Sequence, residues 1–202
     1  MPRRCLKKNP DLVALLFGSF NPIHEGHLAI LRYLLDYTRA GEVRLVVSPQ
    51  NPFKQGQGLV DNARERLAGA RAAVAEASLA VTVSDVEFHL PAPWYTIDTL
   101  RFLQDGEPHR EFVLVMGGDN IAELERWHHG DVILRDFRIW VYPRPGSDAA
   151  PVVARLNASG ACKGVTLFAD APQNAISSTE IRRRRRKKAT EENRKKAGEK
   201  SR

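Results

Sequence analysis

The sequence lacks long apolar runs, and it has only 2 cysteines among its 202 residues. No stretch approaches the roughly 20 apolar residues that a membrane-spanning helix needs, so we expect no contact with a membrane. The basic start, Met1 to Lys8, is not followed by the apolar stretch of a secretory signal peptide. Cys5 and Cys162 belong to no CxxC pair, which argues against a disulfide framework or a zinc site and favours a reducing cytoplasm.

Acidic side chains are scarce at the end of the chain. Residues 182–202 contain 12 Lys or Arg and 3 Glu, a net charge of +9, so the other 181 residues together carry −2. A charge block of this kind is usually solvated, and the alternative is an arm that binds a polyanion such as nucleic acid. We therefore predict one domain over residues 1–181 and a basic, disordered tail over residues 182–202.

Apolar runs that alternate with helical periodicity predict an α/β fold. Buried strands are expected at Leu12 to Phe17, Val43 to Val47 and Phe112 to Met116, and an alternating apolar pattern predicts a strand at Val81 to Phe88. Further strands are expected at Ile139 to Tyr142 and Val165 to Phe168. Helices are expected from His27 to Tyr37, after an N-cap at Asp61, after an N-cap at Thr96 as far as Leu103, from Ile121 to Trp127, from Val152 to Leu156, and after Ser177. This order implies a Rossmann-like, doubly wound, mostly parallel sheet in a single domain. Its ligands should bind beyond the carboxyl ends of the strands, where loops 18–27, 48–58, 117–120 and 143–146 can converge.

The strongest chemical signal is GSFNPIHEGH, residues 18–27, between the first strand and the first helix. Gly18 permits close approach of the backbone to a phosphate, and the helix start near His27 is expected to offer unpaired N–H groups to an anion. His24 and His27 are three apart and therefore share a helical face. Two imidazoles at such a site can donate hydrogen bonds to oxygens that gain charge as pyrophosphate leaves. The alternatives are incidental histidines at a helix start, or metal ligands that lack a third partner nearby.

A second motif, ISSTEIR at residues 176–182, follows near the other end of the chain. Together the two motifs resemble the (H/T)xGH and ISSTxIR signatures of the nucleotidyltransferase superfamily. WYTIDTL at 94–100, MGGDN at 116–120, Trp127 and YPRPG at 142–146 are similar to the bacterial nicotinate-nucleotide adenylyltransferases in particular. The resemblance covers about residues 11–182. After Arg182 the sequence departs from it, because a basic, polar stretch stands where the family continues with a mixed apolar helix.

The resemblance implies the reaction. The phosphate of nicotinate mononucleotide attacks the α-phosphorus of ATP directly, giving deamido-NAD and pyrophosphate in NAD biosynthesis, without a covalent enzyme intermediate. Mg²⁺ is carried on the ATP phosphates, so the protein itself needs no metal ligands. ATP and nicotinate mononucleotide are then the partners.

The resemblance also implies which residues contact each substrate. His24 and His27 face the ATP phosphates. The other residues implied on the ATP side are Gly18, Ser19, Phe20, Lys54, Ser177, Ser178, Thr179 and Arg182. Those implied on the mononucleotide side are Thr96, Gly118, Asp119, Trp127, His128 and Arg144. Trp127 would stack on the pyridine ring, and the backbone N–H groups of Thr96 and His128 would hold the nicotinate carboxylate.

Three alternatives stay open. A phosphopantetheine adenylyltransferase has the same fold, but it usually has Thr in place of His24 and lacks WYTIDTL and GGDN. A nicotinamide mononucleotide enzyme would differ by a single substrate charge, which sequence does not decide. The third alternative is a nucleic-acid-binding protein that acts through its basic tail. The sequence gives no oligomeric state.

Overall fold

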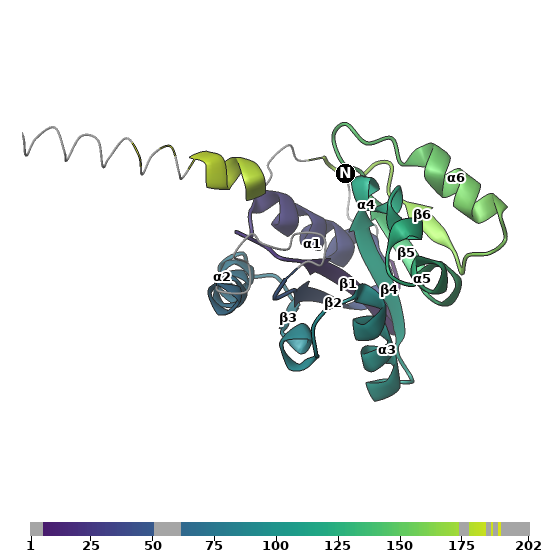
Figure 1. Cartoon of the computed structure of the whole chain (residues 1–202), viewed down its shortest axis with the longest axis horizontal. Helices are drawn as coiled ribbons and strands as arrows, with labels where there is room; N and C mark the ends of the chain where they lie inside the picture. Colours follow the sequence, from purple (N-terminus) through teal and green to yellow (C-terminus); the bar gives the residue numbers. More distant parts are fainter. Residues whose placement is uncertain (1–5, 51–61, 174–177, 185–186, 188–189, 191–202) are drawn as a thin grey trace, which may run out of the picture.

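The structure is a computed structural model that describes residues 6–50, 62–173, 178–184, 187 and 190. Its strands are β1 (Asn9–Gly18), β2 (Ala40–Val47), β3 (Thr82–Ser84), β4 (Glu111–Gly117), β5 (Arg138–Tyr142) and β6 (Val165–Leu167). Its helices are α1 (Glu25–Tyr37), α2 (Ala63–Glu76), α3 (Thr96–Gly106), α4 (Gly118–Ile121), α5 (Gly130–Asp136) and α6 (Ala150–Ala158), with 3-10 turns η2 (Val86–His89) and η3 (Leu124–Arg126). The sheet runs through the middle of the molecule and helices cover both of its faces (Figure 1).

The six strands form one sheet in the order β3-β2-β1-β4-β5-β6, and every pair of neighbours is parallel. Strands β1 to β3 extend from the centre of the sheet to one edge, and strands β4 to β6 extend from the centre to the other edge. The strand order therefore reverses between β1 and β4, which is where such a sheet opens a crevice at its carboxyl edge. This confirms the predicted fold class.

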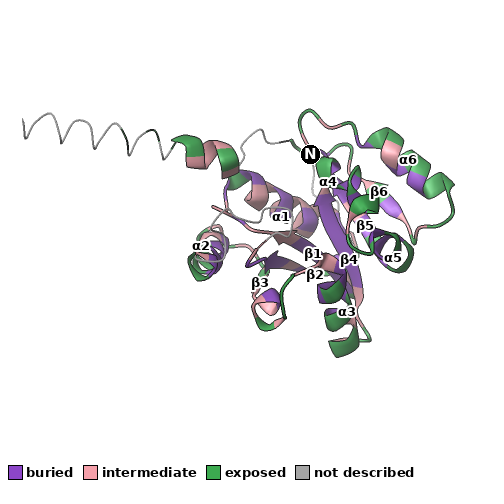
Figure 2. Cartoon of the chain, viewed as in Figure 1, coloured by how far each residue is buried: buried purple, intermediate pink, exposed green. Residues whose placement is uncertain are grey.

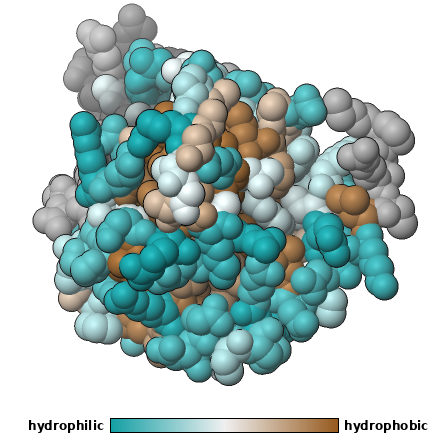
Figure 3. All heavy atoms as spheres, turned by 90° about the vertical axis from the view of Figure 1, so that its right-hand side faces the viewer, coloured by the Kyte–Doolittle hydropathy of each residue, from teal (hydrophilic) through white to brown (hydrophobic). Residues whose placement is uncertain are grey.

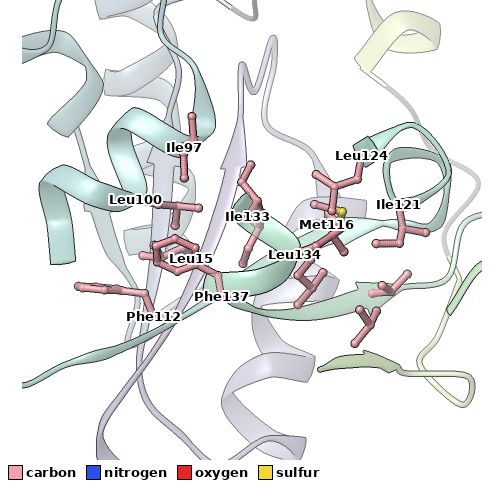
Figure 4. Close-up of a cluster of buried hydrophobic side chains, with 14 of the residues drawn as sticks. Leu15, Ile97, Leu100, Phe112, Met116, Ile121, Leu124, Ile133, Leu134 and Phe137 are labelled. Carbon is pink, nitrogen blue, oxygen red and sulfur yellow. The ribbon is translucent and has the colours of Figure 1, made fainter. Parts of the chain in front are cut away.

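The central strands are buried on both faces, which explains why they read as continuous apolar runs. Val13, Ala14 and Leu15 of β1 are each 0% exposed, and the strands are the most buried elements (Figure 2). Leu15 packs with side chains of β4, α3 and α5 on one face (Figure 4). Ala14 packs with α1 and α2 on the other. Beyond these layers, polar side chains cover most of the side that carries α6 (Figure 3).

The strand predicted from Val81 to Phe88 is wrong in its second half. Only β3 pairs with β2, and the chain then leaves the sheet edge as the 3-10 turn η2. The apolar alternation has a different cause here, since Val86 packs against one core cluster and Phe88 against the other.

The helix predicted from Ile121 to Trp127 is also wrong. Helix α4 ends at Ile121, η3 follows, and the sequence analysis did not anticipate α5. The turn between η3 and α5 is sterically constrained. His129 adopts a left-handed φ of 52°, and Gly130 lies so close to the Leu124 carbonyl that a Cβ would be 1.9 Å from its oxygen.

Two helix starts differ from their predicted positions. The N-cap of α2 is Asn62 rather than Asp61, which lies outside the described residues. The N-cap of α3 is Tyr95, so Thr96 is the first helical residue. Neither cap side chain accepts a hydrogen bond from a backbone N–H of its helix, which explains why capping chemistry did not locate them.

Residues 178–184 are helical and lie beside the start of α1 (Figure 1). The Ser178 hydroxyl donates to the Pro22 carbonyl at 2.9 Å, and the Arg182 guanidinium donates to the Asn21 carbonyl at 2.6 Å. The domain boundary predicted after residue 181 falls inside this helix. The tail beyond it stays a prediction. Within the described ranges, no helix combines the length and apolarity needed to cross a membrane.

Replacing Gly130 by alanine is expected to lower the free energy of unfolding by about 3 kcal/mol, because the new Cβ has no space beside the Leu124 carbonyl. Gly69→Ala is the matched control, since no atom lies within 4 Å of its Cβ position on α2. That variant should instead gain about 1 kcal/mol from helix propensity. Urea unfolding of both variants measures the two effects, and equal stabilities would contradict the packing described for α5.

Candidate active site

The predicted site lies at the carboxyl edge of the sheet. The loop after β1, residues 18–24, starts beside the end of β2, because Gly18 pairs with Val47. The chain after β4 enters α4 beside the end of β5, since Gly117 pairs with Tyr142. As β1 and β4 are neighbours, these two strand ends meet where the strand order reverses. We call the segment of residues 18–24 the phosphate loop from here on, after its predicted role.

Phe20 shapes the phosphate loop from inside. Its side chain is only 3% exposed, its φ is 41°, and its ring meets the His27 imidazole edge-on at 5.0 Å between centroids. A Cβ on Gly18 would be 2.8 Å from this ring. Gly18 is therefore needed here to admit Phe20 next to His27, a packing role that the sequence analysis did not foresee.

His24 and His27 form a reciprocal cap at the start of α1. The Nδ1 atom of His24 accepts from the Gly26 N–H at 3.1 Å, and the Nδ1 atom of His27 accepts from the His24 N–H at 3.3 Å. This is the geometry of a capping box, with imidazoles in place of the usual hydroxyl and carboxylate. Because each Nδ1 accepts a hydrogen bond, each neutral ring carries its proton on Nε2. The two rings are also in contact, with centroids 3.8 Å apart and their planes tilted by 31°.

The His24 imidazole is held in its neutral form. Its side chain is buried, at 9% exposure. Burial lowers its pKa below the usual value, and the nearby positive charge of Arg144 lowers the pKa further. The neutral state agrees with the hydrogen bonds described above, since a protonated imidazole could not accept at Nδ1. Near neutral pH the pair therefore presents two Nε2–H donors.

The expectation of unpaired N–H groups at this helix start is wrong in detail. The Gly26 N–H is taken by the His24 ring, and the N–H groups of His27 and Leu28 both donate to the His24 carbonyl. Helix α1 begins at Glu25, two residues before the predicted start. The ring N–H groups, rather than these amides, are thus the donors that α1 offers at this edge.

Arg66 holds the phosphate loop and the end of β2 together. Its guanidinium, buried under α2, donates to the carbonyls of Ser19, Ser48 and Pro49. Burial lowers the pKa of this group from its ordinary value. The sequence analysis missed Arg66, although a signal was present: it shares the face of α2 that buries Leu67 and Ala70.

Thr96, which opens α3 after the loop that ends at Tyr95, and His128, in the loop before α5, lie on segments that touch each other. The ring of Tyr95, just before Thr96, stacks on the His128 imidazole with centroids 4.1 Å apart. Among the described residues, no acceptor binds the backbone N–H of Thr96 or that of His128. Trp127 is partly buried and packs against the hydrophobic core, and this packing contributes to the fold as well as to the predicted site. The stack thus brings together two loops that each carry an open N–H donor.

Arg144 and Asp119 face each other across the ends of β4 and β5. The Arg144 Nε atom lies 3.9 Å from an Asp119 carboxylate oxygen, and both side chains are partly exposed. Gly118 is buried next to the Ala149 methyl group, and a Cβ added to Gly118 would lie 3.1 Å from that methyl carbon. The positive charge of this arginine also contributes to the lowered pKa of His24.

Glu87 is a buried carboxyl that the sequence analysis did not identify. It is 1% exposed and accepts a hydrogen bond from the Thr99 hydroxyl at 2.9 Å. Burial raises the pKa of Glu87 to about 7, although the Ser48 and Thr99 side chains act to lower it. A glutamate in a 3-10 turn gives no sequence signal of burial.

The structure thus brings most of the predicted residues to one edge of the sheet, but not all can be placed. Lys54 and Ser177 lie outside the described residues. Ser178 and Arg182 contact the phosphate loop through the carbonyls of Pro22 and Asn21, and the exposed Thr179 accepts from Arg182 at 3.1 Å. Within the described part of the chain, no three His, Cys, Asp or Glu side chains gather into a metal-binding group.

Comparison with known proteins adds independent information. The cytidylyltransferase-like family model matches residues 15–184. A protein of Bacteroides thetaiotaomicron named "probable nicotinate-nucleotide adenylyltransferase" is 41% identical over 180 residues, which cover 89% of this chain and 84% of that protein. A protein of the same name from Cytophaga hutchinsonii is 42% identical over 170 residues, covering 84% and 83%. The fold matches that of Plasmodium falciparum nicotinic acid mononucleotide adenylyltransferase complexed with NaAD, with a TM-score of 0.70, 17% identity, and coverage of 86% and 83%.

Glu87→Gln is expected to stabilise the protein more at pH 8 than at pH 5. Because the folded pKa of about 7 exceeds the ordinary glutamate pKa of 4.5, the contribution of Glu87 to stability is complete below pH 4.5 and falls as the pH rises towards 7. The full loss is roughly 3 kcal/mol, and glutamine, which does not ionise, avoids it. Urea unfolding of both proteins at the two pH values gives the difference. If the unfolding free energies of variant and wild type differ by the same amount at pH 5 and at pH 8, the raised pKa of Glu87 is contradicted.

Proposed function

This chain belongs to the nicotinate-nucleotide adenylyltransferases of the cytidylyltransferase-like family, and from that premise we propose how its site performs the reaction. The chain transfers AMP from ATP to nicotinate mononucleotide and releases pyrophosphate, a step of NAD biosynthesis. We propose that this reaction takes place in the cytoplasm.

The observation that carries this proposal is the pair of adjacent imidazoles that cap the start of α1. Both rings are fixed by backbone hydrogen bonds at Nδ1, so both present Nε2–H. Donors that are fixed before the substrate arrives need no reorganisation when charge develops on the phosphate oxygens. We assign His24 and His27 to the triphosphate of ATP, with Ser178, Thr179 and Arg182 on the other side of the phosphate loop.

The reaction is a single displacement at phosphorus. A phosphate oxygen of nicotinate mononucleotide forms a bond to the α-phosphorus of ATP, the bond from that phosphorus to the bridging oxygen breaks, and pyrophosphate leaves with the electron pair. The protein supplies no nucleophile in this scheme. It aligns the two phosphates and stabilises the charge that moves onto the leaving group.

We assign the nicotinate carboxylate to the backbone N–H groups of Thr96 and His128. Both N–H groups lack an acceptor among the described residues, and the Tyr95–His128 stack keeps their loops together. We assign the ring of Trp127, the neighbour of His128 in the chain, to the pyridine of the mononucleotide. Arg144 follows β5 beside His24 and suits the mononucleotide phosphate, with Asp119 and Gly118 across from it.

We propose that Mg²⁺ enters with ATP, bound by the triphosphate oxygens. The side chains at this edge support that assignment, because the described residues offer imidazoles and cations rather than a group of carboxylates. Mg²⁺ commonly binds through substrate phosphates with few protein ligands. Its role in this scheme is to neutralise charge on the leaving pyrophosphate.

Pyrophosphate release tests the assignment directly. The purified chain is mixed with ATP, Mg²⁺ and, separately, nicotinate mononucleotide, nicotinamide mononucleotide or phosphopantetheine. Release with the first acceptor supports the proposal, whereas release only with phosphopantetheine would point to the other adenylyltransferase. RNA and DNA retention at rising salt, run in parallel, tests the remaining prediction that the basic tail contacts a polyanion.

His27→Ala is expected to lower the rate of adenylyl transfer by about 10²- to 10³-fold while the protein stays folded, because a fixed donor is lost. His109→Ala is the matched control, since that exposed histidine precedes β4 at the opposite edge of the sheet. Steady-state kinetics with circular dichroism checks both variants. Wild-type turnover in His27→Ala would refute the role of the imidazole pair.

Nicotinate mononucleotide is expected to be preferred to its amide by roughly tenfold or more, because a carboxylate accepts stronger hydrogen bonds from two N–H groups. The measurement is a competition with both acceptors at equal concentration, with the two dinucleotide products separated and quantified. A preference for the amide would overturn the assignment of Thr96 and His128.

A further inference from the structure

The Glu87 carboxyl takes no part in the chemistry proposed above, yet it is among the most deeply buried charged groups of the described residues. Its Oε1 atom accepts the Thr99 hydroxyl at 2.9 Å, while its Oε2 atom forms no hydrogen bond with any described residue. A buried oxygen without a partner costs stability, so a carboxyl at this place requires an explanation. The explanation lies in the two elements that it joins.

On one side Glu87 holds the first turn of α3. Thr99 is 0% exposed and lies three residues after Thr96, which is one turn of the helix. The α3 N-cap, Tyr95, makes no side-chain bond to its own helix. The Thr99–Glu87 hydrogen bond is therefore a side-chain bond that ties this turn to a different element, the 3-10 turn after β3.

On the other side, the turn η2 that carries Glu87 packs against β2, and Ser48 directly follows β2. The Ser48 side chain also acts to lower the pKa of the Glu87 carboxyl. The Ser48 N–H donates to the Gly18 carbonyl at 2.9 Å, and the Ser48 carbonyl accepts from the buried Arg66 at 2.9 Å. Glu87 thus lies between the backbone that leads into the phosphate loop and the helix that begins with Thr96.

We propose that Glu87 is a positioning residue that fixes the first turn of α3, and with it the Thr96 N–H, relative to the phosphate loop. The inference rests on the proposed function, since it assumes that Thr96 holds the mononucleotide and the phosphate loop holds ATP. Glu87 touches neither substrate. It sets the distance between the half of the site that binds the attacking phosphate and the half that binds the α-phosphate, and such alignment governs the rate of a direct displacement.

The decisive variant is Thr99→Val, which removes the hydroxyl and keeps the shape of the side chain. Loss of one buried hydrogen bond that orients the mononucleotide half is expected to raise the KM and the Kd for nicotinate mononucleotide by about tenfold. The KM for ATP should change by less than about twofold, because the phosphate loop keeps its bonds to Ser48 and Arg66. Isothermal calorimetry with nicotinate mononucleotide alone gives the Kd without turnover.

Two further variants separate positioning from general stability. Glu87→Gln keeps an oxygen that can accept from Thr99, so its KM for nicotinate mononucleotide should stay within about threefold of wild type. Thr38→Val is the matched control, because the Thr38 hydroxyl is equally buried, at 4% exposure, and donates to the Leu34 carbonyl at the far edge of the sheet. It should lower the melting temperature without changing either KM.

The outcomes are distinct. Equal increases of both KM values in Thr99→Val, or the same mononucleotide effect in Thr38→Val, would assign Thr99 and Glu87 to stability alone and overturn the inference. An active wild type with an unchanged mononucleotide Kd in Thr99→Val would overturn it while leaving the proposed function intact. A wild type that releases no pyrophosphate from the two substrates would end both proposals.

Discussion

Parallel pairing on both sides of β1 is the constraint on which the rest of the structure depends. With β2 on one side and β4 on the other, β1 has no exposed edge, and its middle residues are completely buried. Each parallel neighbour requires a crossover that passes over one face of the sheet. The two halves of the chain therefore wind in opposite directions from the centre, and the loops after β1 and β4 meet at the same edge. The site exists because the topology leaves no other place for these loops.

Buried polar bonds then turn this meeting of loops into a fixed geometry. Arg66 connects carbonyls from two successive strand ends, and Glu87 connects the next strand end to α3. Both groups are charged or titratable and both are buried, which costs solvation free energy. Neither lies on an element that the reaction needs for its chemistry. Their contribution is to limit the relative movement of segments that converge from distant parts of the sequence.

The sequence allowed prediction of the sheet and of the site motifs, for physical reasons that differ. Strands such as β1 and β4 were predictable because burial on both faces requires continuous apolar runs. The His24–His27 motif was predictable because its residue types have few structural uses together. The turn at His129 and Gly130 was not, since it depends on a close approach to the Leu124 carbonyl, which is a tertiary contact. Arg66 and Glu87 escaped prediction because charged residues are usually solvated, and only the assembled fold surrounds them.

The imidazole cap of α1 has a consequence for how this protein can change. Serine, threonine, aspartate and asparagine are the strong N-cap residues, so histidine at position 24 starts the helix with a weaker cap than those would provide. Selection for thermal stability alone would favour replacing His24 by one of these residues. The replacement would remove the Nε2–H donor together with the imidazole cap. The same two side chains therefore affect both thermal stability and turnover. At this position, a substitution that raises the stability of the helix start is expected to lower turnover. A more heat-resistant variant must find its gains elsewhere, for example on the solvent face of α2, which carries no bond to the phosphate loop.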